Sequence, residues 1–167
     1  MNTQTLLSIV ADQREELLAN DYSELCPRPE ESQLDLKSNR AQVVIGVRRC
    51  GKSTLCEMFL KQKGIDFAYV NFDDDRMEDM KASDLDHLLE ALYMTYGEFK
   101  YLFLDEIQNI EGWPLFVNRL LRQKMHLFIT GSNSKLLSKE LSTHLTGRNN
   151  KVELYPFSYS EYCAMKI

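Results

Sequence analysis

The chain has 167 residues, with 20 Lys plus Arg against 25 Asp plus Glu, which gives a formal charge of −5 and a pI near 5.3. This length suits a single domain, and an apolar content of 44% is enough for a hydrophobic core, so a disordered chain is excluded. The acidic balance gives no support to nucleic-acid binding. No stretch has the roughly 20 apolar residues that a membrane span needs, so no membrane partner is expected.

The first residues and the cysteines indicate the compartment. The sequence MNTQTLLSIVADQREELL has neither the basic start nor the long apolar run of a signal peptide. The four cysteines, Cys26, Cys50, Cys56 and Cys163, form no CxxC pair and have no accompanying histidine pattern, which disfavours a zinc site. We therefore expect free thiols and a cytoplasmic location.

Residues 1–38 are expected to form an N-terminal helical arm and connector. The apolar residues between Leu6 and Leu18 fall loosely on one face of a helix. The stretch that follows, around Pro27 and Pro29, is rich in residues that interrupt helices.

Residues 39–167 alternate between predicted strands and predicted helices. Short runs of β-branched and aromatic residues predict strands at 42–45, 66–72, 101–104, 126–130 and 152–154. Helical spacing of apolar residues predicts helices at 53–63, 85–96, 113–123 and 134–144. Alternation at such short intervals predicts an α/β fold, with a parallel sheet covered by helices on both faces.

The segment GVRRCGKS follows the first of these strands and opens the first of these helices. It matches the phosphate-binding pattern G-x-x-x-x-G-K-[ST] in the structural context that the pattern requires. Its glycines let the backbone N–H groups turn toward phosphate oxygens, and the helix N-terminus adds its dipole. Lys52 supplies a positive charge and Ser53 a hydroxyl for Mg²⁺. The expected nucleotide-binding residues are Gly46, Val47, Arg48, Arg49, Cys50, Gly51, Lys52, Ser53 and Thr54.

A second candidate segment is YLFLDE, in which four apolar residues lead into Asp105 and Glu106. The carboxyl end of a central strand lies beside the phosphate loop in folds of this class. Asp105 is the candidate to hold a Mg²⁺-bound water, and Glu106 is placed to accept a proton from an attacking water. The alternative is a strand that ends in a solvated acidic turn. Beside a phosphate loop, the pair favours ATP hydrolysis over binding alone.

Two weaker signals lie further along the chain. The strand at 126–130 ends in small polar groups, so Ser132 and Asn133, or else Thr130, are candidates to orient water against the γ-phosphate. Arg148 lies between a Gly turn and the last strand, and is either an arginine finger for a neighbouring protomer or a surface residue. Arg48 and Arg49 are open to contact with phosphate or to pairing with the acidic residues 73–75.

Four segments together resemble the prokaryotic AAA-domain ATPases of the archaeal-ATPase-like group. These segments are GVRRCGKST, YLFLDEIQNIEGWPLFVNRLL, FITGSNSKLLSKELSTHLTGR and VELYPFSYSEY. The resemblance covers about three quarters of the chain, from Asn39 to the C-terminus. It implies a three-layer P-loop NTPase core with a five-stranded parallel sheet in the order 5-1-4-3-2.

The resemblance also implies roles for particular residues. Lys52 and Ser53 would bind phosphate and Mg²⁺, Asp105 and Glu106 would act on metal and water, and a polar sensor would lie near Ser132 or Asn133. Arg148 stands where AAA-type ATPases commonly carry their finger, which would make the protein a homo-oligomer. Family members usually continue into a helical lid and a C-terminal domain. Residues 39–167 are therefore expected to be the ATPase core without those parts.

The leading hypothesis is an ATPase that uses Mg²⁺ and couples hydrolysis of ATP to a conformational change. ATP is favoured over GTP partly because no NKxD-like segment is present. One alternative is a P-loop phosphotransferase, which would need an acceptor site. The other is a nucleotide-gated interaction module that binds ATP with negligible turnover.

Overall fold

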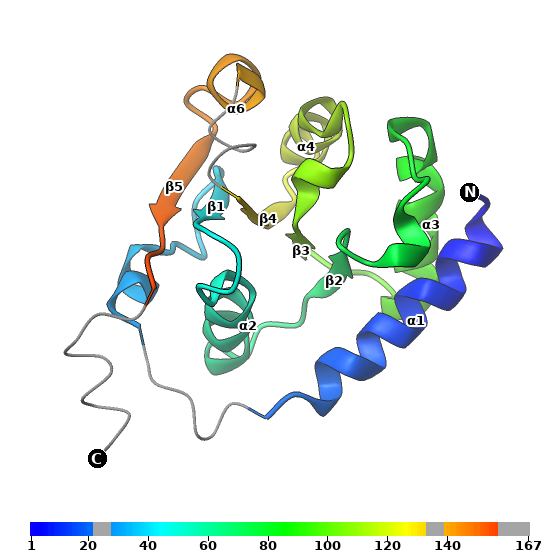
Figure 1. Ribbon diagram of the computed structural model, residues 1–167, viewed down its shortest axis with the longest axis horizontal. Coiled ribbons are helices and arrows are strands. Elements are labelled where there is room, and N and C mark those ends of the chain that lie inside the picture. The colour runs from blue at the N-terminus through cyan, green and yellow to red at the C-terminus, as the bar shows by residue number, and fades with distance from the viewer. Residues whose placement is uncertain (22–27, 133–138, 157–167) are drawn as a thin grey trace.

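The computed structural model describes residues 1–21, 28–132 and 139–156 (Figure 1). Its centre is a sheet of five strands, of which every neighbouring pair is parallel. The strands are β1 (Ala41–Ile45), β2 (Ala68–Asn71), β3 (Tyr101–Asp105), β4 (His126–Gly131) and β5 (Asn149–Glu153). Their order is β2-β3-β4-β1-β5, which confirms the order 5-1-4-3-2 and the P-loop NTPase type of α/β core.

Helices cover both faces of this sheet, as Figure 1 shows. The α-helices in the described part are α1 (Thr3–Ala19), α2 (Lys52–Gln62), α3 (Leu85–Tyr96), α4 (Trp113–Arg122) and α6 (Lys139–His144). Single 3₁₀ turns connect them at η1 (Pro29–Gln33), η2 (Asp75–Met77), η3 (Ala82–Asp84) and η4 (Ile107–Asn109). None of the helices described is long and apolar enough to cross a membrane.

The alternation of side chains along each strand divides the core into two layers. Val43, Leu104 and Ile129 face the layer formed with α1, α3, α4 and α6. Val44 and Phe103 face the layer formed with α2 and the segment before β1. Because both faces of a parallel sheet are buried, its strands are almost continuously apolar, which is the pattern that identified them in the sequence.

The N-terminal helix α1 packs directly on the core. Leu6, Ile9 and Val10 are buried in the same apolar layer as β2 and α3. Gln13 is also buried, and its amide exchanges hydrogen bonds with the backbone of Asn71 at the end of β2. The helix expected as an arm is thus fixed to the edge of the sheet by apolar contacts and by this amide.

Most boundaries of the elements lie within one residue of those predicted, and β2 begins at Ala68, two residues later than predicted; β5 and α6 differ more. Strand β5 begins at Asn149, three residues earlier than its apolar pattern indicates. The polar start is held by pairing of Asn149 with Ala41 and by hydrogen bonds from Asn150 Nδ2 to Gln42 Oε1 and to the carbonyl of Gln33. The helix expected at 134–144 is described only as α6, and its first five residues lie outside the described part.

Candidate functional site

The loop between β1 and α2 passes close to the end of β5. A Cβ atom on Gly46 would lie 2.4 Å from the carbonyl oxygen of Leu154 and 2.6 Å from Cys50 Sγ, so only glycine fits there. Gly51 has a φ of 94°, a left-handed conformation that glycine adopts without strain, and it directly precedes the first residue of α2. The glycines of the sequence pattern are therefore required by the geometry of the loop.

Lys52 is nearly buried inside this loop, with a side chain only 4% exposed. Its Nζ donates to the carbonyl oxygens of Gly46 and Val47, each at 3.0 Å, and lies 3.5 Å from Glu106 Oε1. The ammonium is thus held between the loop backbone and the carboxylate that follows β3. The positive charge of Lys52 therefore lies at the N-terminus of α2. The free N–H groups of a helix N-terminus favour an anion as well, so the two effects act together.

Asp105 is the last residue of β3. Its side chain is buried and contacts Ser53, the residue that follows Lys52. Ser53 Oγ donates to Asp105 Oδ1 at 2.8 Å, Thr130 Oγ1 donates to the same oxygen, and Tyr69 donates to Oδ2 at 2.9 Å. Burial raises the pKa of the Asp105 carboxyl above its usual range, while the three hydroxyl donors oppose that rise.

The pair formed by Ser53 and Asp105 is suited to a hard divalent cation. Mg²⁺ prefers oxygen ligands and is commonly held by one or two protein groups, with water and phosphate oxygens completing its shell. A hydroxyl and a carboxylate oxygen in contact provide such a donor set. Within the described residues, no group of three or more His, Cys, Asp or Glu side chains could hold a metal alone. Any Mg²⁺ here would therefore need ligands from the nucleotide and from water.

Glu106 follows directly and adopts a left-handed backbone conformation, with φ 56° and ψ 48°. Its backbone N–H donates to Thr130 Oγ1 at 2.9 Å, so Thr130 connects the two carboxylate residues. Its side chain is partly exposed, with Oε1 toward Lys52 and Oε2 accepting from Gln108 Nε2 at 2.5 Å. A carboxylate that is partly open and close to the loop can reach a ligand bound there.

The structure brings some of the predicted residues together and separates others. Ser132 is half-buried just after β4, at the same edge of the sheet as the loop, and Asn133 lies outside the described residues. Thr54 lies in the first turn of α2.

The two arginines of the loop are exposed. Arg48 lies 3.8 Å from Asp73, one of the acidic residues that the sequence offered as its partners. Arg49 has a positive φ of 65°.

Arg148 lies at the opposite edge of the sheet. Its carbonyl accepts from the N–H of Ala41, the first residue of β1, whereas the loop follows the last residue of that strand. Its guanidinium donates to Asn118 Oδ1 at 3.1 Å on α4. Because β1 lies between them, Arg148 does not share a site with Lys52 within one protomer.

Sequence reasoning missed two contributors to the site and gave a third a different role. Tyr69 and Gln108 were not singled out, and Thr130 was considered only as a residue that orients water. Tyr69 lies on β2, and its ring also packs edge-on against Phe103. All three residues have polar side chains within a strand or in the turn after one, and the sequence shows that much. Which residue each of them contacts can be told only when the order of the strands is known.

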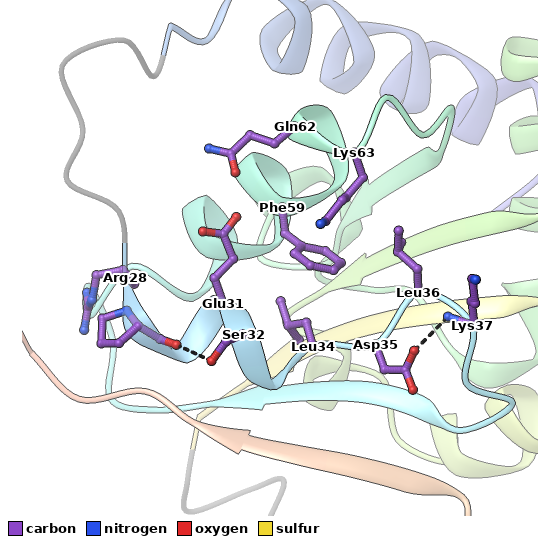
Figure 2. Close-up of a pocket in the computed structure, with 11 residues that line it drawn as sticks. Arg28, Glu31, Ser32, Leu34, Asp35, Leu36, Lys37, Phe59, Gln62 and Lys63 are labelled. Atoms are coloured by element: carbon purple, nitrogen blue, oxygen red, sulfur yellow. Dashed lines mark hydrogen bonds between the residues drawn. The ribbon is translucent and has the colours of Figure 1, made fainter.

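A pocket of about 580 Å³ lies beside the loop, between α2 and the segment that precedes β1 (Figure 2). Arg28 connects the pocket with the loop, because it lines the pocket and its guanidinium donates to the carbonyl of Cys50 at 3.1 Å. The lining residues are Arg28, Pro29, Glu31, Ser32, Leu34, Asp35, Leu36, Lys37, Phe59, Gln62 and Lys63. The segment expected as a connector therefore forms one wall of a concave surface next to the loop.

Comparisons with known proteins identify the family of this chain. Residues 38–163 match a family model described as an AAA domain. An uncharacterized protein of Methanocaldococcus jannaschii is 41% identical over 135 residues, which cover 80% of this chain and 30% of that protein. An uncharacterized protein of Haemophilus influenzae is 38% identical over 133 residues, covering 75% of this chain and 33% of its own length. The chain thus spans about a third of the length of these curated relatives.

Proposed function

Since the chain belongs to the AAA-domain family, we propose that it binds Mg-ATP, hydrolyses it, and couples hydrolysis to a conformational change. One observation carries this proposal. At the end of β3, Asp105 contacts the hydroxyl of Ser53, and the next residue, Glu106, contacts the ammonium of Lys52. A metal-binding pair and a base beside a cation are the parts that phosphoryl transfer to water requires.

The proposed binding step uses the loop and the start of α2. ATP phosphates replace the carbonyls of Gly46 and Val47 as partners of the Lys52 ammonium. Ser53 and Asp105 are the residues that would hold Mg²⁺, which when bound neutralises charge on the β- and γ-phosphates. The N–H groups at the helix start donate to phosphate oxygens.

In the proposed chemical step, Glu106 accepts a proton from the water that attacks the γ-phosphate. Lys52 stabilises the charge that develops on the transferring group. Thr130 holds the backbone of Glu106 and the side chain of Asp105 in a fixed relation through its one hydroxyl. Ser132 and Asn133 remain the candidates for a sensor of the γ-phosphate, since Ser132 follows β4 at this edge.

Arg148 enters the proposal only through a second protomer. Its place at the far edge of the sheet leaves no route to the Lys52 loop of its own chain. In a homo-oligomer it would approach the γ-phosphate of a neighbour and stabilise the transition state. Such an assembly makes turnover per chain depend on protein concentration.

A second candidate is a nucleotide-gated interaction module with negligible turnover. The observation that favours it is the engagement of both Glu106 oxygens, one by Lys52 and one by Gln108. With Oε2 bonded to Gln108 and Oε1 beside Lys52, both oxygens have protein partners that an attacking water would have to replace.

The test is steady-state hydrolysis of Mg-ATP by the parent chain, by Glu106→Gln, and by the control Glu98→Gln, over a range of protein concentrations. Glu98 is an exposed glutamate just before β3, so it reports the effect of the substitution itself. We expect Glu106→Gln to bind ATP as the parent does and to lose turnover by about 100-fold or more. Equal hydrolysis by Glu106→Gln and the parent would show that Glu106 is not the base. Tight binding by the parent without turnover would favour the interaction module.

A further inference from the structure

We propose that Gln108 is a positioning residue for Glu106, and that it holds Oε1 of that carboxylate toward the water that attacks the γ-phosphate. The inference rests on the proposed ATPase activity and extends it to a residue outside the loop and the acidic pair. It starts from the different partners of the two oxygens of Glu106.

The amide of Gln108 holds one oxygen and leaves the other toward the loop. Gln108 Nε2 donates to Glu106 Oε2 at 2.5 Å, which is short for a hydrogen bond between an amide and a carboxylate. Oε1 faces Lys52 Nζ at 3.5 Å. Since Lys52 is the cation that would bind the phosphates, Oε1 is the oxygen that a phosphate-bound water would meet. Rotation of the carboxylate would break the contact with Gln108.

The turn that carries Gln108 is fixed independently of its side chain. Ile107 and Ile110 are buried at either end of η4, and the N–H of Ile110 donates to the carbonyl of Ile107 at 3.0 Å. Asn109 Nδ2 donates to the carbonyl of Phe72 at 3.2 Å, which anchors the turn to the end of β2. The amide of Gln108 is therefore held on a rigid base and is not needed to close the turn.

Two unfavourable features surround this contact. Glu106 has a positive φ, which is uncommon for a residue other than glycine. Gln108 Oε1 is buried and accepts a hydrogen bond from no residue in the described part of the chain. Turning the amide over would bring this oxygen against the carboxylate, so the orientation is set by Glu106. Features of this kind persist where surrounding structure enforces them, and they concentrate at functional sites.

The experiment compares Gln108→Met with the parent chain and with the control Gln123→Met. Methionine keeps the length of glutamine and removes its N–H donors, and Gln123 is an exposed glutamine at the end of α4. Three quantities are measured: kcat and KM for Mg-ATP, the affinities for Mg-ADP and for Mg-ADP with fluoroaluminate, and the melting temperature. The fluoroaluminate complex mimics the transferring phosphoryl group and reports on the site even without turnover.

We expect Gln108→Met to lower kcat by about 10- to 100-fold and to weaken the fluoroaluminate complex by a similar factor. Its KM, its Mg-ADP affinity and its melting temperature stay close to those of the parent and of Gln123→Met. This division separates positioning from a structural role, because a destabilised turn would lower the melting temperature and weaken both complexes.

The outcomes distinguish this inference from the function on which it rests. Parent-like kcat and fluoroaluminate affinity in Gln108→Met, with turnover lost in Glu106→Gln, would overturn the role of Gln108 and leave the ATPase standing. Joint loss of melting temperature and Mg-ADP affinity would overturn it in favour of a structural role. A parent chain that does not hydrolyse ATP overturns the ATPase proposal, and the fluoroaluminate affinities then decide the role of Gln108. A parent chain that neither hydrolyses ATP nor binds Mg-ADP with fluoroaluminate more tightly than Mg-ADP alone overturns both.

Discussion

The carboxyl edge of the sheet holds a buried charged side chain with several partners, whereas Arg148 at the amino edge is exposed and bonds through its side chain to one described neighbour. At the carboxyl edge, Asp105 accepts from three hydroxyls that come from α2, β2 and β4. At the amino edge, Arg148 contacts Asn118 on the surface, and the ring of His126 stacks on that of Tyr101.

The difference lies in the free energy needed to bury a charged group, which is large for Asp105 and small for Arg148. A buried carboxylate is expensive unless several donors satisfy it, and removing one donor leaves part of that cost uncompensated. Exposed pairs such as Arg148 with Asn118 contribute little and can be lost without unfolding. We therefore expect equivalent substitutions at the two edges to have unequal effects.

The largest difference in stability is expected between two glycine substitutions. Gly46→Ala should reduce the free energy of unfolding by about 3 kcal/mol, because the new Cβ would overlap the Leu154 carbonyl and the backbone must move. Gly147→Ala, at the amino edge, has open space around its Cβ and a φ of 76°, so it should lose only about 1 kcal/mol from the left-handed conformation. Urea unfolding of both variants measures this, and equal losses would contradict the difference between the edges.

The next effect concerns two lysines. Lys52→Ala should weaken the affinity for Mg-ATP by about 10- to 100-fold, because it removes the cation held inside the loop. Lys100→Ala, an exposed residue just before β3 at the amino edge, should leave that affinity nearly unchanged. Isothermal titration calorimetry gives both values. Similar losses in the two variants would place the phosphates elsewhere.

A third prediction follows from Glu57 on α2. Burial raises the pKa of this carboxyl to about 7, the negative charge of Asp105 adds to the rise, and Asn20 and Lys61 oppose it. The folded protein therefore holds a proton that the unfolded chain releases between pH 4.5 and about 7. Over this range the group's contribution to stability falls as the pH rises, and it stays low above pH 7.

Glu57→Gln removes that titration and keeps an acceptor for the amide of Asn20. We expect the variant to be about 1 to 2 kcal/mol more stable than the parent at pH 8, with the difference shrinking toward pH 5. Unfolding in urea at the two pH values measures it. A difference independent of pH would mean that Glu57 is ionised throughout the range.

The smallest effect is expected from Arg148→Ala in dilute solution. Because its one described side-chain partner is Asn118 on the surface, the stability of the chain should change by less than about 0.5 kcal/mol. Turnover per chain should match the parent at low protein concentration and should fail to rise with concentration, if Arg148 acts on a neighbour. Arg122→Ala, on the surface of α4, is the control. A parent whose turnover is flat with concentration would leave Arg148 a structural residue.

The sequence alone determined the parts of this protein that depend on neighbours along the chain. The loop from Gly46 to Ser53, the helices with regular apolar spacing and the strands buried on both faces all carry local patterns, and in the described residues each lies within three residues of its predicted place. The position of Asp105 and Glu106 at the end of β3 was predicted because acidic residues after an apolar strand are a local pattern too. The strand order followed from the resemblance to a known family and was confirmed.

Only the tertiary structure decided which side chains meet. The register places Asn71 beside Asp105 and Ile129 beside Leu104, and so brings Tyr69 and Thr130 to one carboxylate from opposite sides of β3. The early start of β5 and the position of Arg148 likewise depend on pairing with β1. Such contacts join residues 25 to more than 100 positions apart. They depend on which strands are neighbours and in what register, and this information is not contained in any single segment of the chain.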